Sequence, residues 1–252
     1  MEHPPCRRER KPQAQPRAPW AEAACAVLLC AAPLAMAGRP LSSDDASTAD
    51  AGTCQAEVWS GRDTAARSMV VAPACGVAAG LELGADHTRF SPRGTQPDQA
   101  GLTLKWAPAA WQTSSVAGEL NFGLKLSGSW VNAAGASWQH AQTSALVLAT
   151  WKAGETIAMH ANLGAARDRA SRIQGTLLNL AVALTPLDSL LLFAEVQGND
   201  KREVFGRTVA SVGTRWWLVK DTLGLDLSAS REVGAGAGKR WTFGLGWYGI
   251  GS

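Results

Sequence analysis

Charged residues, tyrosine and histidine are scarce in this chain. Of its 252 residues, 18% are charged, and it has a single tyrosine and four histidines. An ordinary soluble domain has roughly 25% charged residues, and a coiled coil would need many more Glu and Lys. The net charge of +3 is spread along the chain, so no nucleic-acid-binding face is indicated. The apolar fraction of 46% also excludes a disordered chain.

The first 37 residues have the order of a secretory signal. A basic segment is followed by an apolar run over 23–35 and by Ala35-Met36-Ala37 before Gly38, which is a small-x-small cleavage site. A transmembrane helix would need about 20 apolar residues, and this run is shorter. We therefore expect residues 1–37 to be a signal peptide for export through the Sec pathway. A disordered basic tail followed by a core helix is the alternative.

Two of the five cysteines, Cys54 and Cys75, lie beyond the predicted signal. In an exported chain, two cysteines indicate one disulfide. Two free thiols or a soft metal pair are the alternatives, but no Cys-x-x-Cys or nearby histidine spacing supports a metal site. We expect no metal and no cofactor.

Residues 38–75 are polar and rich in small residues, and we interpret them as a periplasmic leader with room for one short hairpin. From residue 76 to 252 apolar residues recur at every second position, as in Leu120, Phe122, Leu124 and Leu126. This period indicates half-buried strands, because a helix would repeat near 3.6. We expect about ten strands, at residues 76–86, 98–108, 115–127, 140–151, 155–166, 172–184, 189–197, 205–218, 222–231 and 240–250.

The apolar stretch 177–196 resembles a transmembrane helix in length. However, Asn179, Pro186, Asp188 and Glu195 make a helical span costly, and Thr185-Pro186-Leu187-Asp188 is a turn signal, so we predict a hairpin. Long and short connections alternate along the predicted strands, with 86–98 long, 108–114 shorter and 152–154 tight. Outer-membrane barrels have this rhythm, with long loops outside and short turns in the periplasm.

The less apolar face of the strands consists mostly of Gly, Ala, Asn and Ser with isolated charges. Such residues suit the crowded interior of a narrow barrel, whereas a soluble barrel would present Lys, Glu and Thr to water. By parity the charges that face the lumen are Glu82, Lys105, Glu119, Lys125, Glu195, Arg215 and Asp226. They would form either a lumen filled with ion pairs or a narrow water-filled path whose selectivity they tune.

Tryptophans lie at or near the predicted strand ends, as the aromatic girdles of a membrane barrel require. They are Trp106, Trp130, Trp151, Trp216, Trp217, Trp241 and Trp247. The sequence thus predicts a closed antiparallel up-and-down transmembrane β-barrel of about 10 strands (range 8–12).

The signal AMA-GRP, the alternating strands and the closing segment RWTFGLGWYGIGS together resemble the Gram-negative outer-membrane β-barrel proteins. Such chains usually end on Phe or Trp, whereas this one continues to Ile250-Gly251-Ser252. The resemblance implies location in the cell outer membrane, contact with its lipid and lipopolysaccharide, and insertion by the barrel-assembly machinery. Basic residues of the longer connections could bind lipopolysaccharide phosphates: Arg89, Arg93, Arg167, Arg169, Arg172, Lys201 and Arg202.

The predicted function is a non-catalytic small pore or transporter-like protein with a small-molecule solute and no nucleic-acid partner. One alternative is a soluble periplasmic β-barrel that binds an apolar ligand. The other is an outer-membrane-embedded hydrolase or acyltransferase, for which His140 and Ser144 are the candidates. They share one strand but lie too far apart along it for a hydrogen bond, and no GxSxG, HExxH or P-loop pattern is present. We therefore predict no catalytic residue.

Overall fold

The computed structural model describes residues 41–63, 66–94, 96–133, 136–234 and 238–251. These residues belong to a compact unit that spans Ala35–Ser252. The predicted signal peptide at 1–37 lies outside the described residues.

Antiparallel strands make up most of the described chain. Their bounds are β1 Cys54–Arg62, β2 Arg67–Ala78, β3 Leu81–Ser91, β4 Asp98–Trp106, β5 Gln112–Ser115, β6 Gly118–Asn132, β7 Gln139–Ala153, β8 Ile157–Asp168, β9 Gln174–Leu187, β10 Leu190–Asn199, β11 Val209–Val219, β12 Leu223–Glu232 and β13 Lys239–Ile250. Two short helices interrupt them, η1 (Ala109–Trp111) and α2 (Arg202–Phe205). None of the helices in the described ranges is long and apolar enough to span a membrane.

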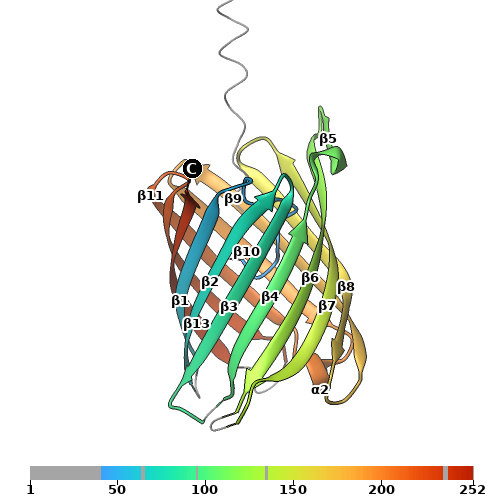
Figure 1. Cartoon of the computed structure of the whole chain (residues 1–252). Helices are drawn as coiled ribbons and strands as arrows, with labels where there is room; N and C mark the ends of the chain where they lie inside the picture. The colour runs from blue at the N-terminus through green and yellow to red at the C-terminus, as the bar shows by residue number, and fades with distance from the viewer. Residues whose placement is uncertain (1–40, 64–65, 95, 134–135, 235–237, 252) are drawn as a thin grey trace, which may run out of the picture. The chain divides into compact units, whose positions relative to one another are not determined.

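Twelve of the described strands close into a ring (Figure 1). Each strand pairs with its neighbours in the sequence, β4 pairs with β6, and β1 pairs with β13 to complete the barrel. The short strand β5 pairs with the first residues of β6, beyond the point where β4 ends. The predicted closed antiparallel barrel is confirmed, and twelve strands lie within the predicted range.

The hairpin for which the predicted leader had room does form, and it belongs to the barrel. It consists of β1 and β2, which lie between β13 and β3 in the ring. The barrel wall therefore begins at Cys54 and not near residue 76. The remaining ten strands of the ring correspond to the ten predicted ones, with ends that differ by a few residues.

The two ends of the barrel differ in their connections. One end of the barrel holds the start of β1 and the end of β13, and we call it the terminal end. Four of the connections there have two or three residues, as at 79–80 and 154–156. The exception is 107–117, which holds η1 and β5, whereas the sequence predicts a connection at 108–114 that is shorter than 86–98. Figure 1 shows β5 projecting at this end. At the other end the described connections are longer, up to the segment 200–208 that contains α2. By the rule for outer-membrane barrels, the terminal end is periplasmic and the other end is the outer end.

The outer wall is apolar and the interior is polar or small, as strand β6 illustrates. Phe122, Leu124 and Leu126 are exposed on the outer face, while Asn121 and Lys125, which alternate with them, are at least partly buried inside. Most exposed large apolar side chains of the other strands lie on the same outer face, including Leu83, Leu102, Val147, Met159, Leu163, Leu180, Val212, Leu227 and Phe243. In water this outer surface would be an extensive exposed apolar patch. The hydrocarbon core of a membrane is the environment in which such an apolar outer face is stable.

Candidate functional site

Residues 41–53, here called the lumen segment, lie inside the barrel, where Figure 1 shows them as a blue loop within the wall. Strand side chains hold the main chain of this segment. Glu195 of β10 accepts hydrogen bonds from the amides of Ser42 and Ser43, both at 2.9 Å from its Oε2. Asn162 of β8 accepts from the Asp44 amide and donates to the Asp44 carbonyl, at 2.9 and 2.8 Å. Buried main-chain groups need such partners, and the wall supplies them.

Further along, the lumen segment contacts β7, the neighbour of β8, and then β3, which lies across the ring from β10. The Ala46 amide donates to Thr150 Oγ1 of β7 at 2.8 Å, and Thr150 Oγ1 also lies 3.0 Å from His160 Nδ1. The Ala49 amide donates to Glu82 Oε2 of β3 at 2.8 Å. The segment is therefore fixed by side chains of β10, β8, β7 and β3, which surround it.

Two lumen lysines are neutralised by the carboxylates of this segment. Lys125 Nζ lies 2.5 Å from Asp44 Oδ2. Lys105, which is 4% exposed, has its Nζ 3.6 Å from Asp44, 3.4 Å from Asp45 and 3.8 Å from Glu82. A buried charge without a partner is strongly unfavourable. The two aspartates therefore neutralise cations of the wall, and we call Lys105, Lys125, Asp44, Asp45 and Glu82 the segment cluster.

The end of the lumen segment is fastened to β2 at the periplasmic end. The Gly52 amide donates to the Gly76 carbonyl at 2.8 Å, and the Gly76 amide donates to the Thr53 carbonyl at 2.9 Å. A Cβ at position 76 would collide with the main chain of Asp50, so glycine is required for this close approach. One residue further on, Cys54 and Cys75 form the predicted disulfide.

A second group of charges spans the seam where the ring closes. Arg215 of β11 is 2% exposed and donates two hydrogen bonds to Asp226 of β12, at 2.7 and 2.8 Å. Its Nη2 lies 3.5 Å from Glu57 Oε1 of β1, and the Tyr248 hydroxyl of β13 donates to the same glutamate. The guanidinium carbon is 5.0 Å from the Trp217 ring centroid. We call these five residues the closure cluster.

Six of the seven charges predicted to face the lumen take part in these contacts. Glu82, Lys105, Glu195, Arg215 and Asp226 are buried and Lys125 is largely so, and all six have the partners given above. Glu119 is partly buried near the periplasmic end of β6, opposite Lys152 of β7. A role of these charges in selectivity stays a prediction.

The seven tryptophans predicted as girdles do not all share one environment. Trp106, Trp216, Trp241 and Trp247 are 42–62% exposed on the outer wall, and their place at a membrane interface stays a prediction. Trp151 and Trp130 are partly buried; the Trp151 indole donates to the Ala117 carbonyl at 3.1 Å, and Trp130 contacts His140. Trp217 differs, because it contacts Arg215 and Tyr248 inside the barrel. Adjacent residues of a strand face opposite sides, so Trp216 and Trp217 cannot both face lipid.

Among the described residues, no hydrogen bond or ion pair joins His140 or Ser144, the candidate catalytic pair, to a carboxylate. His140 Nε2 lies 3.1 Å from Thr143 Oγ1. Ser144 stands opposite Ser127 of β6 and Ala166 of β8. In the described ranges, no group of three or more His, Cys, Asp or Glu side chains could hold a metal ion.

The sequence interpretation missed the residues of the lumen segment, above all Asp44 and Asp45, because a polar stretch before the first recognised strand has the composition of a linker. One signal was available. Parity placed Lys105 and Lys125 in an enclosed lumen, and buried cations require anionic partners. The acidic residues of the segment are such partners.

A closed antiparallel ring with an apolar outer wall and a charged interior is the architecture of an outer-membrane β-barrel protein, since only helices and closed barrels satisfy their main chain in lipid. This protein is accordingly located in the cell outer membrane. Residues 24–246 match the family described as "Uncharacterised conserved protein UCP029691", and the chain belongs to that family. No curated protein matches the chain.

Solved porin structures share the fold. The "KdgM porin" superposes with a TM-score of 0.56 at 7% identity, over 77% of this chain and 98% of the porin. The "KdgM porin in complex with disordered oligogalacturonate" gives 0.58 at 9% identity with the same coverages. The NanC porin gives 0.56 at 7% identity, over 76% of this chain and 98% of that one. At such identities the likeness concerns the fold.

Proposed function

We propose that this protein is an outer-membrane pore whose passage is closed by its own lumen segment and opens when that segment leaves the barrel. The observation that carries the proposal is the way in which residues 41–50 are held. Their described contacts with the wall are hydrogen bonds to side chains, ion pairs and the packing of Ala46 on Leu146 and Leu148. The ladder pairings of the ring start at Cys54, so the wall keeps them without the segment.

Departure of the segment would change the charge of the lumen. Lys125 would lose Asp44, and Lys105 would keep Glu82 of the wall. A small anionic solute could then occupy the place of the Asp44 carboxylate, because an ammonium group forms its strongest hydrogen bonds with charged oxygen acceptors. The fold shared with porins, one of them described with oligogalacturonate, supports a passage for such solutes. In this proposal the protein has no catalytic step and needs no cofactor.

The test is conductance across a planar lipid bilayer. The exported chain is compared with a variant that lacks residues 41–50, which retains the Gly76 contacts and the disulfide. The deletion variant should conduct steadily, while the parent should be closed for most of the recording. A second variant, in which residues 42–50 are replaced by Gly and Ser at the same length, keeps the chain length and removes the side-chain anchors. It should open more often than the parent.

Two results would contradict the proposal. Equal conductance of the parent and the deletion variant would mean that the lumen segment does not close the passage. Silence of both, with both folded by heat-modifiable gel migration, would mean that the barrel is an anchor or an assembly element and not a pore.

A further inference from the structure

The arginines of the described chain are concentrated at one end of the barrel. Apart from Arg215 of the closure cluster, every arginine in the described ranges lies in an outer connection or within two positions of an outer strand end. The outer end faces the lipopolysaccharide leaflet of a Gram-negative outer membrane. Its lipids carry phosphates, which guanidinium groups bind through paired hydrogen bonds.

Four of these arginines form a compact group on the wall itself, which we call the outer-wall arginine cluster: Arg62 of β1, Arg67 of β2, Arg89 of β3 and Arg93 of the connection that follows β3. Arg62 and Arg67 are directly opposite each other in the ladder. Arg89 is opposite Met69 and hence diagonal to Arg67. Diagonal neighbours lie about 7–8 Å apart. All four side chains are exposed.

Like charges directly opposite each other in a ladder are destabilising. Among the described residues, no ion pair joins any of the four arginines to a carboxylate. The basic residues of the α2 connection differ. Lys201, Arg202 and Arg207 each have a carboxylate within 4.0 Å: Asp200, Glu203 and Glu232.

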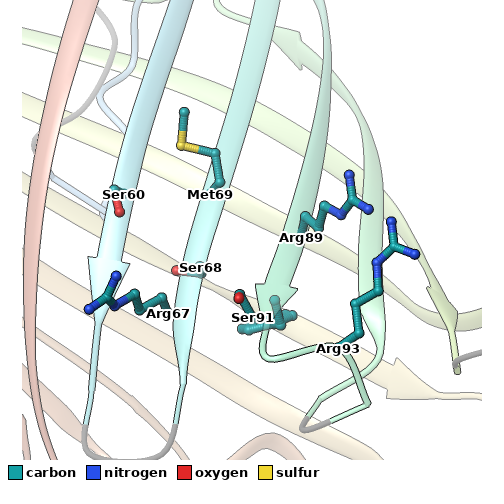
Figure 2. Close-up of a pocket in the computed structure, with 8 residues that line it drawn as sticks. Ser60, Arg67, Ser68, Met69, Arg89, Ser91 and Arg93 are labelled. Carbon is teal, nitrogen blue, oxygen red and sulfur yellow. The ribbon is translucent and has the colours of Figure 1, made fainter.

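The arginines border a hollow of about 320 Å³ on the wall, lined by Arg67, Arg89, Arg93, Met69 and four neighbouring residues. Figure 2 shows Arg89 and Arg93 extending on one side of this pocket and Arg67 on the other. Towards the membrane centre, the outer face of β2 continues with exposed Met69 and Val71. On β3, exposed His87 and then Ala85 lie between Arg89 and exposed Leu83. Successive outward positions of one strand are about 7 Å apart, so on β2 the cationic rim gives way to apolar wall within two positions.

We infer that the outer-wall arginine cluster is a binding site for the phosphate of a lipid A molecule, whose acyl chains lie along Met69, Val71 and Leu83. The cations supply the charge that a phosphate needs, and the apolar wall below them selects a lipid headgroup over a free anion. A lipid bound here would also relieve the repulsion between Arg62 and Arg67. This site is independent of the lumen segment and of the proposed pore.

The test measures binding of lipid A to the detergent-solubilised full barrel by native mass spectrometry. The probes are lipid A with both phosphates, the same lipid without phosphates, and inorganic phosphate. The site variant carries Arg67→Ala, Arg89→Ala and Arg93→Ala. The matched control carries Lys201→Ala, Arg202→Ala and Arg207→Ala, which remove the same number of exposed charges at the same end.

The site variant should bind lipid A at least about tenfold more weakly than the parent, because several hydrogen bonds to a charged group are lost, and the control should bind like the parent. The dephosphorylated lipid should bind the parent as weakly as lipid A binds the site variant. Equal weakening in both variants would show general charge attraction and overturn the inference. Unchanged binding in the site variant would overturn it too, as would inorganic phosphate that binds as tightly as lipid A.

Discussion

The closure cluster and the segment cluster solve the same problem, a buried cation in the lumen, in different ways. Arg215 is neutralised by Asp226 and Glu57, which are fixed in strands at the seam of the ring. Lys105 and Lys125 are neutralised largely by Asp44 and Asp45, which belong to a segment outside the strand ladder. The first arrangement is built into the strands of the wall. The second depends on a segment outside the ladder, and the proposed closing of the lumen uses this difference.

The largest effect is expected in the closure cluster. Substitution Arg215→Met would leave Asp226 and Glu57 buried without their cation, and removal of one partner of a buried ion pair costs about 3–5 kcal/mol. The free energy of unfolding in urea, measured in lipid vesicles by tryptophan fluorescence, should fall by that amount.

The exposed pair of Lys220 and Asp188 at the periplasmic end provides the control. Lys220→Met should leave the unfolding midpoint unchanged, because exposed ion pairs contribute little. A combined variant with Arg215→Met, Asp226→Leu and Glu57→Gln should recover part of the loss, since no buried charge is then unpaired. If Arg215→Met and Lys220→Met had the same small effect, the closure cluster would not stabilise the barrel.

A smaller effect on unfolding is expected in the segment cluster. The double substitution Asp44→Asn with Asp45→Asn keeps the shape of the lumen segment and removes its charges, while Lys105 retains Glu82. The open fraction in bilayer recordings should rise about tenfold, which corresponds to about 1.4 kcal/mol. The free energy of unfolding should change less than in Arg215→Met. A larger loss of stability than in Arg215→Met would show that the segment is an integral part of the wall.

Much of the barrel could be predicted because a strand with one face in lipid repeats strictly. The period of two in β6, where Phe122, Leu124 and Leu126 face outward, gives both the strand and the lumen side of Lys125. The first hairpin was harder to recognise. Strand β2 contains Pro73 and Gly76. Gly76 is needed for the close approach of the lumen segment, so the apolar alternation of β2 is weak at this part of the strand.

The position of the lumen segment could not be derived from local pattern. Asp44 is held by Asn162 and Lys125, and these contacts join residues far apart in the chain. Composition and periodicity describe neighbours in sequence, so they cannot show which strand side chains accept the main-chain amides of a polar segment. Trp217 illustrates the same limit, because its partners Arg215 and Tyr248 come together only when the ring closes.

The central claim is that the lumen segment lies inside the barrel with Ser43 and Ala46 buried, and thiol accessibility tests it most directly. Ala46 is 4% exposed inside the lumen, whereas Val116 is fully exposed in the β5–β6 turn at the periplasmic end. Single substitutions Ala46→Cys and Val116→Cys are compared in the folded barrel for their rates of reaction with a charged maleimide. The account predicts much slower reaction at position 46, with the rate at position 46 raised about tenfold by Asp44→Asn with Asp45→Asn, in step with the open fraction. Equal rates at positions 46 and 116 in the parent background would contradict it.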